Sequence, residues 1–410
     1  MEKETDVNPK KVVLLYSGGL DTSVLLKWIQ EKYGCELVTV TLDIGQKGKD
    51  FAHVKEKALN LGAKKAFVID AKKEFADCFV AKAIKANALY EGEYPVSTSI
   101  ARPLIAEHGI KVALQEGADA IAHGCTGKGN DQVRFDLAIQ TLAPQLKAIA
   151  PVREWGMARE DEIEYAKKHG IPISVDASSP YSIDENLWGK STECGIIEHP
   201  DKEVPKEVLS IVTHPSDALD EAGYVKLQFE HGVPVALNGV AMELWQLIDK
   251  LNAIAGAHGI GIIDHTEDRI VGLKSREFYE CPAATVILKA HKDLEKFVCT
   301  IHENHFKPML DQKWAYLAYA GLWYEPLMAE IEAYMDKVNE KVNGEVTVKL
   351  FKGSAMVVGR KSPNALYNLK LATYEKGQIF NQASSPGFIE LFGLQSKMAY
   401  QLSKQLESKK

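Results

Sequence analysis

Residues 12–23, with the sequence VVLLYSGGLDTS, have the types and spacing that bind an anion. An apolar, β-branched run ends at Ser17, two glycines follow, and Asp21 opens an amphipathic stretch, which predicts a strand, a tight turn and a helix. The N-terminus of a helix presents free backbone N–H groups and the positive end of the helix dipole. Gly18 and Gly19 let the backbone approach phosphate oxygens, although the lysine of a Walker A loop is absent. The segment therefore predicts a phosphate-binding turn.

A second dense segment, residues 123–135, has the sequence HGCTGKGNDQVRF. Its three glycines lie within six residues, which indicates an unusual backbone conformation or a backbone that closely approaches a ligand. Asn130 or Asp131 could cap the predicted helix, but that role does not explain the glycines or Arg134, one turn further along. An α-amino acid needs a partner for its carboxylate and another for its ammonium group. This segment offers both, so we expect it to bind one.

The first half of the sequence alternates between the periods typical of strands and of helices. Repeated βα units of this kind predict a parallel, doubly wound α/β sheet with helices on both faces. Ligands of such sheets bind at the carboxyl ends of the strands. Because Ser17, Asp43 and His123 follow three of these strands, we expect their loops to converge on one crevice. Strands are expected at 12–16, 37–42, 66–69, 120–122 and 148–151, and helices at 22–33, 50–61, 73–89, 100–116 and 132–142.

The remaining sequence indicates a second, α+β domain and a helical arm. Residues 383–410 predict a helix with an apolar stripe, which we expect to pack on another subunit. The expected domains are 1–170 for nucleotide binding, 171–365 as the second domain and 366–410 as an oligomerisation arm. Within the second domain, strands are expected at 225–229, 234–237, 269–273 and 346–350, a helix at 244–258, and loops at 178–194 and 198–215.

The composition is typical of a soluble globular protein. Of 410 residues, 46% are hydrophobic and 26% are charged, and the formal net charge of −7 disfavours a nucleic acid as the main partner. The six cysteines form no C-x-x-C motif, which indicates reduced thiols rather than a disulfide scaffold or a metal site. The N-terminal residues lack the apolar region of a signal peptide, and no apolar stretch approaches the roughly 20 residues that span a bilayer. We therefore expect a cytoplasmic protein without a membrane partner.

Six motifs, in the same order along the chain, resemble those of the argininosuccinate synthase family of the ATP pyrophosphatase superfamily. They are YSGGLDTS, STSIARP, GCTGKGNDQVRF, YSIDENLWG, VGLKSREFYE and GRKSPNALY, and the resemblance extends from about residue 10 to the C-terminus. It implies an enzyme that uses ATP to ligate citrulline and aspartate to argininosuccinate, a step of arginine biosynthesis and of the urea cycle. A citrullyl-adenylate would be the intermediate, and AMP and pyrophosphate would be released. The resemblance also implies Mg²⁺ bound with ATP, no organic prosthetic group, and a homotetramer.

The resemblance further implies which residues bind each substrate. The ATP ligands would be Leu15, Tyr16, Ser17, Gly18, Gly19, Leu20, Asp21, Thr22, Ser23, Leu42 and Gly124. The aspartate ligands would be Thr126, Asn130 and Asp131, and Asp131 is also the candidate catalytic residue, as a base for the aspartate amine. The citrulline ligands would be Tyr94, Ser99, Asn130, Arg134, Ser182, Ser191, Glu267 and Tyr279. No protein side chain is expected to ligate the metal.

Two other functions use similar features. A sulfur transferase that modifies tRNA shares the pyrophosphate loop, but it needs a reactive cysteine pair and a basic face, and the sequence shows neither. A non-catalytic sensor of ATP and amino acids would not need two amino-acid sites that meet at one phosphate. Both functions stay open as alternatives.

Overall fold

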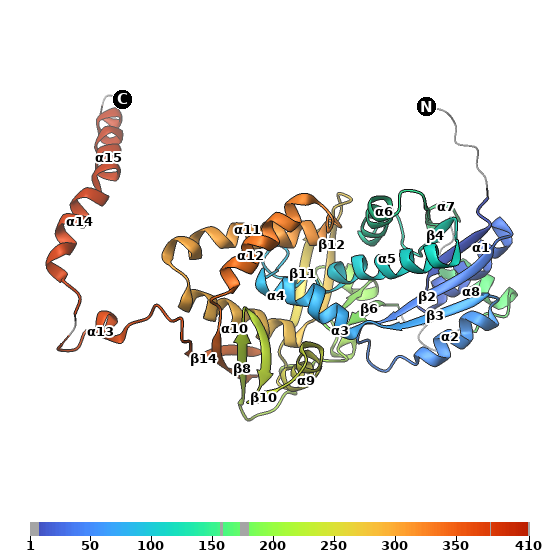
Figure 1. Cartoon of the computed structure of the whole chain (residues 1–410), viewed down its shortest axis with the longest axis horizontal. Coiled ribbons are helices and arrows are strands. Elements are labelled where there is room, and N and C mark those ends of the chain that lie inside the picture. The colour runs from blue at the N-terminus through green and yellow to red at the C-terminus, as the bar shows by residue number, and fades with distance from the viewer. Residues whose placement is uncertain (1–7, 156–158, 173–179, 378, 409–410) are drawn as a thin grey trace. The chain divides into compact units, whose positions relative to one another are not determined.

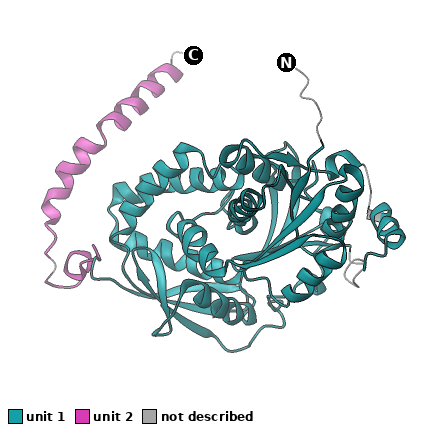
Figure 2. Ribbon diagram, turned by 45° about the vertical axis from the view of Figure 1, so that its right-hand side comes forward, with its two compact units in different colours: residues 1–364 teal, residues 365–410 magenta. Residues whose placement is uncertain are grey.

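The computed structural model describes residues 8–155, 159–172, 180–377 and 379–408. The chain divides into two compact units, residues 1–364 and residues 365–410 (Figure 2). Among the described helices, none combines the length and the apolar character needed to cross a membrane.

A five-stranded sheet organises the N-terminal part of the first unit (Figure 1). All of its strands are parallel, in the spatial order β3-β2-β1-β4-β5. The chain runs from β1 to β2 and β3, and β4 later adds to the other side of β1, so the direction of winding switches between β1 and β4. The carboxyl ends of strands at such a switch point are where ligands bind. The predicted parallel α/β sheet is confirmed, with strands β1 (Lys11–Leu15), β2 (Glu36–Asp43), β3 (Lys65–Asp70), β4 (Ala120–Ala122) and β5 (Lys147–Ile149).

Helices cover both faces of this sheet. Val12 and Leu14 pack in one apolar cluster with α1, α2 and α8, whereas Val13 and Leu15 pack in another cluster that includes α5. Both faces of β1 are therefore buried, which explains why its sequence is a continuous apolar run. The helices of this part are α1 (Leu20–Tyr33), α2 (Phe51–Asn60), α5 (Ser97–Glu116), α6 (Asp131–Leu142), α7 (Val152–Trp155) and α8 (Arg159–Lys168).

The helix expected over residues 73–89 is divided and ends early. It consists of α3 (Lys72–Phe75), a π-helical segment η1 (Ala76–Val80) and α4 (Ala81–Lys85). Asn87 has a φ of +42°, and its side-chain amide donates hydrogen bonds to Glu295 and Asp311. A continuing α-helix needs a negative φ, so these tertiary contacts, to residues far away in the sequence, accompany the end of the helix.

Two antiparallel sheets form the rest of the first unit, and the expected α+β part is confirmed. One has the strand order β10-β9-β8-β13-β14 and the other has the order β11-β12-β7-β6. The strands of the first are β8 (Gly223–Glu230), β9 (Val233–Leu237), β10 (Val240–Ala241), β13 (Gly344–Phe351) and β14 (Ser354–Lys361). Those of the second are β6 (Ser182–Asn186), β7 (Gly189–Glu193), β11 (Ile262–Asp268) and β12 (Lys274–Glu280). The helices are α9 (Leu244–Ala257), α10 (Pro282–Val298), α11 (Ile301–Tyr319) and α12 (Pro326–Asn339), with short 3₁₀ turns at Gly195–Glu198 and Lys206–Val208.

The four-stranded sheet corrects two expectations. The strand predicted at residues 269–273 is wrong, because these residues form the turn between β11 and β12, where Gly272 has a φ of +88°. The loop predicted at residues 178–194 contains the hairpin β6–β7 instead. Part of that loop, residues 173–179, lies outside the described residues. The hairpin strands carry polar residues at alternate positions, so they lack the apolar pattern that identifies a half-buried strand.

The second unit contains α13 (Leu369–Ala372), a 3₁₀ turn at Gln382–Ser384, α14 (Ser385–Phe392) and α15 (Leu394–Glu407). The single tail helix expected from the sequence is therefore interrupted at Gly393, which ends α14. The apolar stripe is present and all of its members are exposed: Phe388, Leu391, Phe392, Leu394, Met398, Leu402 and Leu406.

Candidate active site

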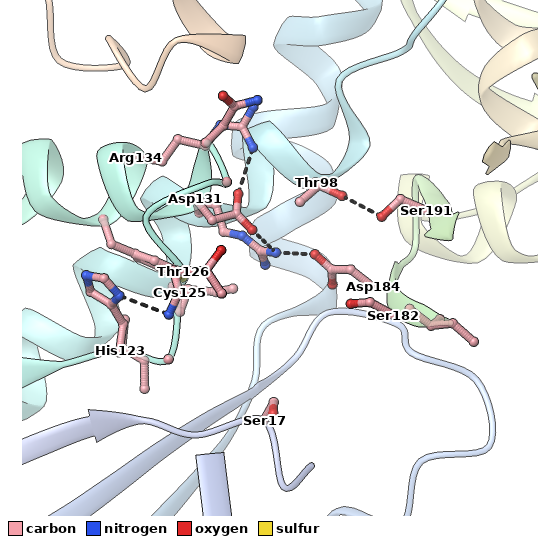
Figure 3. A pocket seen from close by; sticks show the side chains of 18 of the residues that line it. Ser17, Thr98, His123, Cys125, Thr126, Asp131, Arg134, Ser182, Asp184 and Ser191 are labelled. Carbon is pink, nitrogen blue, oxygen red and sulfur yellow. Dashed lines mark hydrogen bonds and ion pairs between the residues drawn. The ribbon is translucent and has the colours of Figure 1, made fainter. Parts of the chain in front are cut away.

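A cavity of about 410 Å³ lies at the carboxyl ends of β1, β2 and β4, against the four-stranded sheet. Leu15, Leu42 and His123, at or just beyond the ends of these three strands, line it. The cavity therefore lies at the switch point of the parallel sheet, and the loops after β1 and β4 converge there as expected. The loop after β2 reaches the same cavity through Lys49, whereas Asp43 does not line it. Figure 3 shows Ser17 on one side of the cavity, with Asp131 and Arg134 across from it.

The first loop, between β1 and α1 (residues 16–19), leaves the N-terminus of α1 open to the cavity. Gly19 is the N-cap residue, and among the described residues no side chain accepts a hydrogen bond from the first turn as a cap. Ser17 Oγ lies 3.0 Å from Thr22 Oγ1, so the two hydroxyl groups are held together at the start of the helix. Free N–H groups, hydroxyl donors and the helix dipole converge at this point. The arrangement can bind phosphate oxygens.

We expect Gly18→Ala to raise the KM for ATP, the nucleotide that the sequence resemblance implies, by on the order of ten- to a hundredfold, equal to about 1.4–2.7 kcal/mol of lost binding. Gly18 has a φ of +82°, and an added Cβ would lie 2.8 Å from Cγ2 of Val54. Either the loop or α2 must move to relieve this contact. Gly48→Ala is the matched control, because Gly48 also has a positive φ, of +70°, and nothing lies within 4 Å of its added Cβ. Steady-state kinetics would measure both variants, and an equal KM for ATP in both would contradict the proposed role of the loop.

The second loop runs from the end of β4 to the first residue of α6 (residues 123–131), and the side chain of His123 orients its first residues. Its Nδ1 accepts a hydrogen bond from the backbone N–H of Cys125 at 3.3 Å, and its Nε2 lies 2.9 Å from Asp136 Oδ1. Because Nδ1 accepts, the ring proton is on Nε2 and points at the carboxylate. The imidazole thereby fixes the direction in which the backbone leaves β4 toward Gly124 and Thr126.

The second loop brings a carboxylate between two guanidinium groups. Asp131 Oδ1 accepts a hydrogen bond from Arg134 Nη1 at 2.7 Å, and Asp131 Oδ2 accepts one from Arg102 Nη2 at 2.7 Å. Arg102 also pairs with Asp184, on β6. Burial by itself would raise the pKa of Asp131, but the two arginines outweigh it and hold that pKa far below its ordinary value. Asp131 is therefore a permanent negative charge at the centre of the cavity.

One face of the four-stranded sheet supplies most of the remaining polar groups. Successive residues of a strand point to opposite faces, so residues two apart share a face. The β6–β7 and β7–β12 registers place Asp184 opposite Ser191, and Ser191 opposite Tyr279. Thr98 Oγ1 lies 3.5 Å from Ser191 Oγ, which brings α5 against this face (Figure 3). The sheet residues that line the cavity at alternate positions are Ser182, Asp184, Ser191, Glu193, Glu267, Glu277 and Tyr279.

A second acidic group, Glu267, lies among tyrosines. Its Oε2 accepts a hydrogen bond from the hydroxyl of Tyr279 at 2.7 Å, and its Oε1 accepts one from the hydroxyl of Tyr319. The amide of Asn130 donates to the same Tyr319 oxygen at 2.8 Å. Tyr94 stacks on Tyr279 with ring centroids 4.0 Å apart. Burial raises the pKa of Glu267, although these hydrogen bonds stabilise its carboxylate. No cationic side chain in the described part of the chain forms an ion pair with this carboxylate, so it can bind the ammonium group of an amino acid.

Most of the site residues expected from the sequence line this one cavity, and four do not. Gly18, Leu20, Ser23 and Ser99 are not among the lining residues. The hydroxyl of Ser23 donates to the backbone oxygen of Gly19 at 2.6 Å, so it supports the loop from within. The hydroxyl of Ser99 is buried and has no hydrogen-bond partner among the described residues. The residues that do line it are Leu15, Tyr16, Ser17, Gly19, Asp21, Thr22, Leu42, Tyr94, Gly124, Thr126, Asn130, Asp131, Arg134, Ser182, Ser191, Glu267 and Tyr279.

The cavity also contains polar residues that the sequence analysis did not assign. Arg102 lies in the motif STSIARP, so its position in that motif was an available signal. Asp184 and Glu193 lie two residues from Ser182 and Ser191, so a correct strand assignment would have found them. Tyr319 ends a long helix that shows no motif. The unassigned polar residues are Thr41, Lys49, Thr98, Arg102, Asp184, Glu193, Arg269, Glu277 and Tyr319.

Comparison with known proteins identifies the family. Residues 11–172 match the family model described as the arginosuccinate synthase N-terminal HUP domain, and residues 181–399 match the arginosuccinate synthase C-terminal domain. An argininosuccinate synthase of Pyrococcus furiosus is 58% identical over 392 residues, which cover 96% of this chain and 95% of that protein. One of Dehalococcoides mccartyi is 53% identical over 401 residues, 98% of each chain. One of Symbiobacterium thermophilum is 52% identical over 389 residues, 95% of this chain and 97% of that protein. With its parallel nucleotide-binding sheet and a full-length match, this chain belongs to the argininosuccinate synthase family.

Proposed function

We propose that this enzyme ligates citrulline to aspartate at the expense of ATP and releases argininosuccinate, AMP and pyrophosphate. The observation that carries the proposal is that one cavity joins a phosphate-binding turn to two sets of groups suited to α-amino acids. The ureido carbon of citrulline is a poor electrophile. Transfer of an adenylyl group to its oxygen supplies a leaving group, which the aspartate amine then displaces.

The nucleotide would bind at the carboxyl edge of the parallel sheet. Its phosphates would contact the turn at Ser17 and Gly19 and the hydroxyl of Thr22, at the uncapped N-terminus of α1. Its base would lie near Leu42 and Gly124, which line the same cavity. Mg²⁺ would arrive with ATP and neutralise phosphate charge. Its ligands would be nucleotide oxygens and water.

The two amino acids would bind on opposite sides of the reacting atoms. Aspartate would use Thr126, Asn130 and Asp131 of the second loop, whose polar groups face the cavity. Citrulline would lie along the polar face of the four-stranded sheet, with its ammonium group at Glu267 and its carboxylate near Arg134. The positive charge of the Arg134 guanidinium, which already donates to Asp131 and to the backbone oxygen of Tyr319, suits a carboxylate. The other proposed citrulline ligands are Tyr94, Asn130, Ser182, Ser191 and Tyr279.

Exchange of labelled pyrophosphate into ATP tests this function directly. We expect exchange that requires citrulline and does not require aspartate, because adenylation of citrulline precedes the second amino acid. Addition of aspartate should then produce AMP and argininosuccinate in equal amounts. Exchange without citrulline, or no exchange under any condition, would contradict the proposal and favour another acceptor, such as a sulfur-transfer substrate, or a non-catalytic role.

We also propose that the second unit assembles the enzyme into a homotetramer in the cytoplasm. Phe388 and Phe392 stack on each other with ring centroids 5.1 Å apart, and their exposed fractions are 64% and 78%. An apolar stripe of this length needs a partner to be buried.

Truncation of the arm is expected to lower the oligomeric state. A chain that ends at Ala383 lacks the stripe, and so should have a smaller solution mass by light scattering than the full chain. A full-length variant with Phe388→Glu and Phe392→Glu should behave in the same way while keeping the polar faces of both helices. An unchanged mass in either variant would show that the stripe does not hold the subunits together.

A further inference from the structure

Three charged side chains form a cluster at the end of the polar sheet face. Arg269, in the turn after β11, donates from Nη2 to Glu193 Oε2 at 2.6 Å and to Glu277 Oε1 at 2.6 Å. A single guanidinium therefore compensates two carboxylates, and the cluster carries one net negative charge. Neither carboxylate belongs to the substrate ligands proposed above.

The two carboxylates differ in what they can reach. The side chain of Glu277 is 7% exposed, and it also accepts a hydrogen bond from Ser275 Oγ at 3.0 Å. The side chain of Glu193 is 40% exposed. Both side chains line the cavity, and Glu193 is the more open of the two to a bound substrate.

Arg269 also connects this cluster to the loop that we propose for aspartate. Its Nη1 donates to the backbone oxygen of Lys128 at 3.2 Å. Asn130 and Asp131, two of the proposed aspartate ligands, follow Lys128 after Gly129. The carboxylate of Glu193 is thus separated from the aspartate loop by one guanidinium group.

The reaction needs a base in this region. At neutral pH the amine of aspartate is an ammonium group, which has no lone pair for attack on the adenylate. Asp131 is a weak proton acceptor, because Arg102 and Arg134 stabilise its ionised form. A carboxylate such as Glu193, which shares one arginine with a second carboxylate, is less stabilised in its ionised form and is therefore a stronger proton acceptor than Asp131.

We propose that Glu193 is the general base that takes a proton from the aspartate ammonium group. This inference rests on the proposed function and assigns a residue to its second step. The ammonium proton moves to Glu193, and the freed lone pair forms the C–N bond to the ureido carbon of the neutral adenylate. A second proton passes from the attacking nitrogen to the imino nitrogen of the same carbon. The C–O bond then breaks, and its electron pair leaves on AMP, which gives a protonated guanidinium product.

The surroundings of Glu193 suit this task. Burial and the charge of Glu277 raise its pKa to about 7, Arg269 opposes that rise, and Asp131 adds to it. The other neighbours that face it are Ser182, opposite it on β6, and Cys194, which follows it in the chain. A base with a pKa near the working pH combines an available ionised form with useful basicity.

Separate measurement of the two half-reactions of Glu193→Gln tests the proposal. We expect citrulline-dependent ATP–pyrophosphate exchange within about threefold of the wild-type rate, because adenylation uses no amine. Argininosuccinate formation at pH 7 should fall on the order of a hundred- to a thousandfold, within the range of general-base effects. Loss of exchange in the wild type would contradict the proposed function itself, whereas equal losses of both half-reactions in Glu193→Gln would overturn only the base assignment.

The pH dependence and the nucleophile provide a second readout. The wild-type ligation rate should fall below about pH 7, as Glu193 gains a proton, and level off above it. The rate of Glu193→Gln should instead rise about tenfold per pH unit toward alkaline pH, because only the free amine reacts. Aminooxysuccinate, whose nucleophilic nitrogen is unprotonated at neutral pH, should react at similar rates with both enzymes. A Glu193→Gln enzyme that keeps the wild-type acid limb, or that fails equally with both nucleophiles, would overturn the proposal.

Glu277→Gln is the matched control, since Glu277 lies on the neighbouring strand β12, on the same face of the sheet, and contacts the same arginine. Removal of its negative charge lowers the pKa of Glu193, so the acid limb should move to lower pH and remain present. If Glu277→Gln abolished the limb and Glu193→Gln kept it, the base would be Glu277 and the assignment to Glu193 would be wrong.

Discussion

Asp131→Asn is expected to reduce kcat/KM for aspartate by roughly a hundred- to a thousandfold, about 3–4 kcal/mol of lost stabilisation. Asp131 is the negative charge between Arg102 and Arg134, with hydrogen bonds of 2.7 Å to each. An asparagine keeps the shape of the side chain, but its NH₂ group must face one of the two guanidinium groups. It also lacks the negative charge that would attract the ammonium group of the aspartate substrate. The loss should therefore appear mainly as a higher KM for aspartate in steady-state kinetics.

A control variant and a separate half-reaction distinguish a local effect on aspartate binding from a general loss of activity. Asp136→Asn, on the same helix, changes a carboxylate that contacts Arg153 at 2.8 Å and His123 at 2.9 Å and does not line the cavity. Asparagine keeps an oxygen that can accept the hydrogen bond from His123, so the loss should be smaller than about tenfold. Citrulline-dependent pyrophosphate exchange should fall much less than ligation in Asp131→Asn. A KM for aspartate within threefold of wild type would contradict the proposed aspartate site. A lower kcat with an unchanged KM would instead support the catalytic role predicted for Asp131 and would argue against Glu193.

Lys307→Met is expected to lower the free energy of unfolding by about 3–5 kcal/mol, which is typical when one partner of a buried ion pair is removed. Lys307 is 1% exposed and lies 2.8 Å from Glu295 and 2.7 Å from Asp311. Its ammonium group also donates to the backbone oxygen of Lys85 at 2.9 Å. Methionine fills the space but removes the cation that pairs with both carboxylates, and it leaves the Lys85 carbonyl with only the hydrogen bond from Asn339. Chemical denaturation would measure the change.

The pH dependence of this loss follows from the pKa of Asp311, which burial raises to about 6. A carboxyl with a raised pKa in the folded state stabilises the protein at low pH, and this contribution disappears as the pH rises through that pKa. Without Lys307 the pKa of Asp311 rises further, so Lys307→Met should be destabilised more at pH 8 than at pH 5. Lys337→Met removes an exposed ion pair to Glu340 and should cost less than about 1 kcal/mol. Equal effects of the two variants would show that the buried cluster does not contribute to stability.

The sequence by itself determined the parallel sheet and the position of its ligand edge. Hydrophobic runs that stop at Ser17 and His123, separated by helical periods, leave few arrangements other than consecutive βα units. The glycines of the two loops identified the segments that approach a ligand, because glycine permits backbone conformations that other residues rarely adopt. Local patterns of this kind are sufficient to predict a strand or a helix wherever the element buries apolar side chains along a whole face.

Only the tertiary structure decided which carboxylates meet which cations. Glu193, Arg269 and Glu277 come from different strands and a turn, and their types and spacing in the sequence do not indicate a shared guanidinium. The β6–β7 hairpin escaped prediction for the same reason, because its polar residues are turned toward a cavity that exists only once the two parts of the first unit pack together. Charge balance in a buried site depends on distances of a few ångströms between residues far apart along the chain. A one-dimensional pattern does not contain those distances.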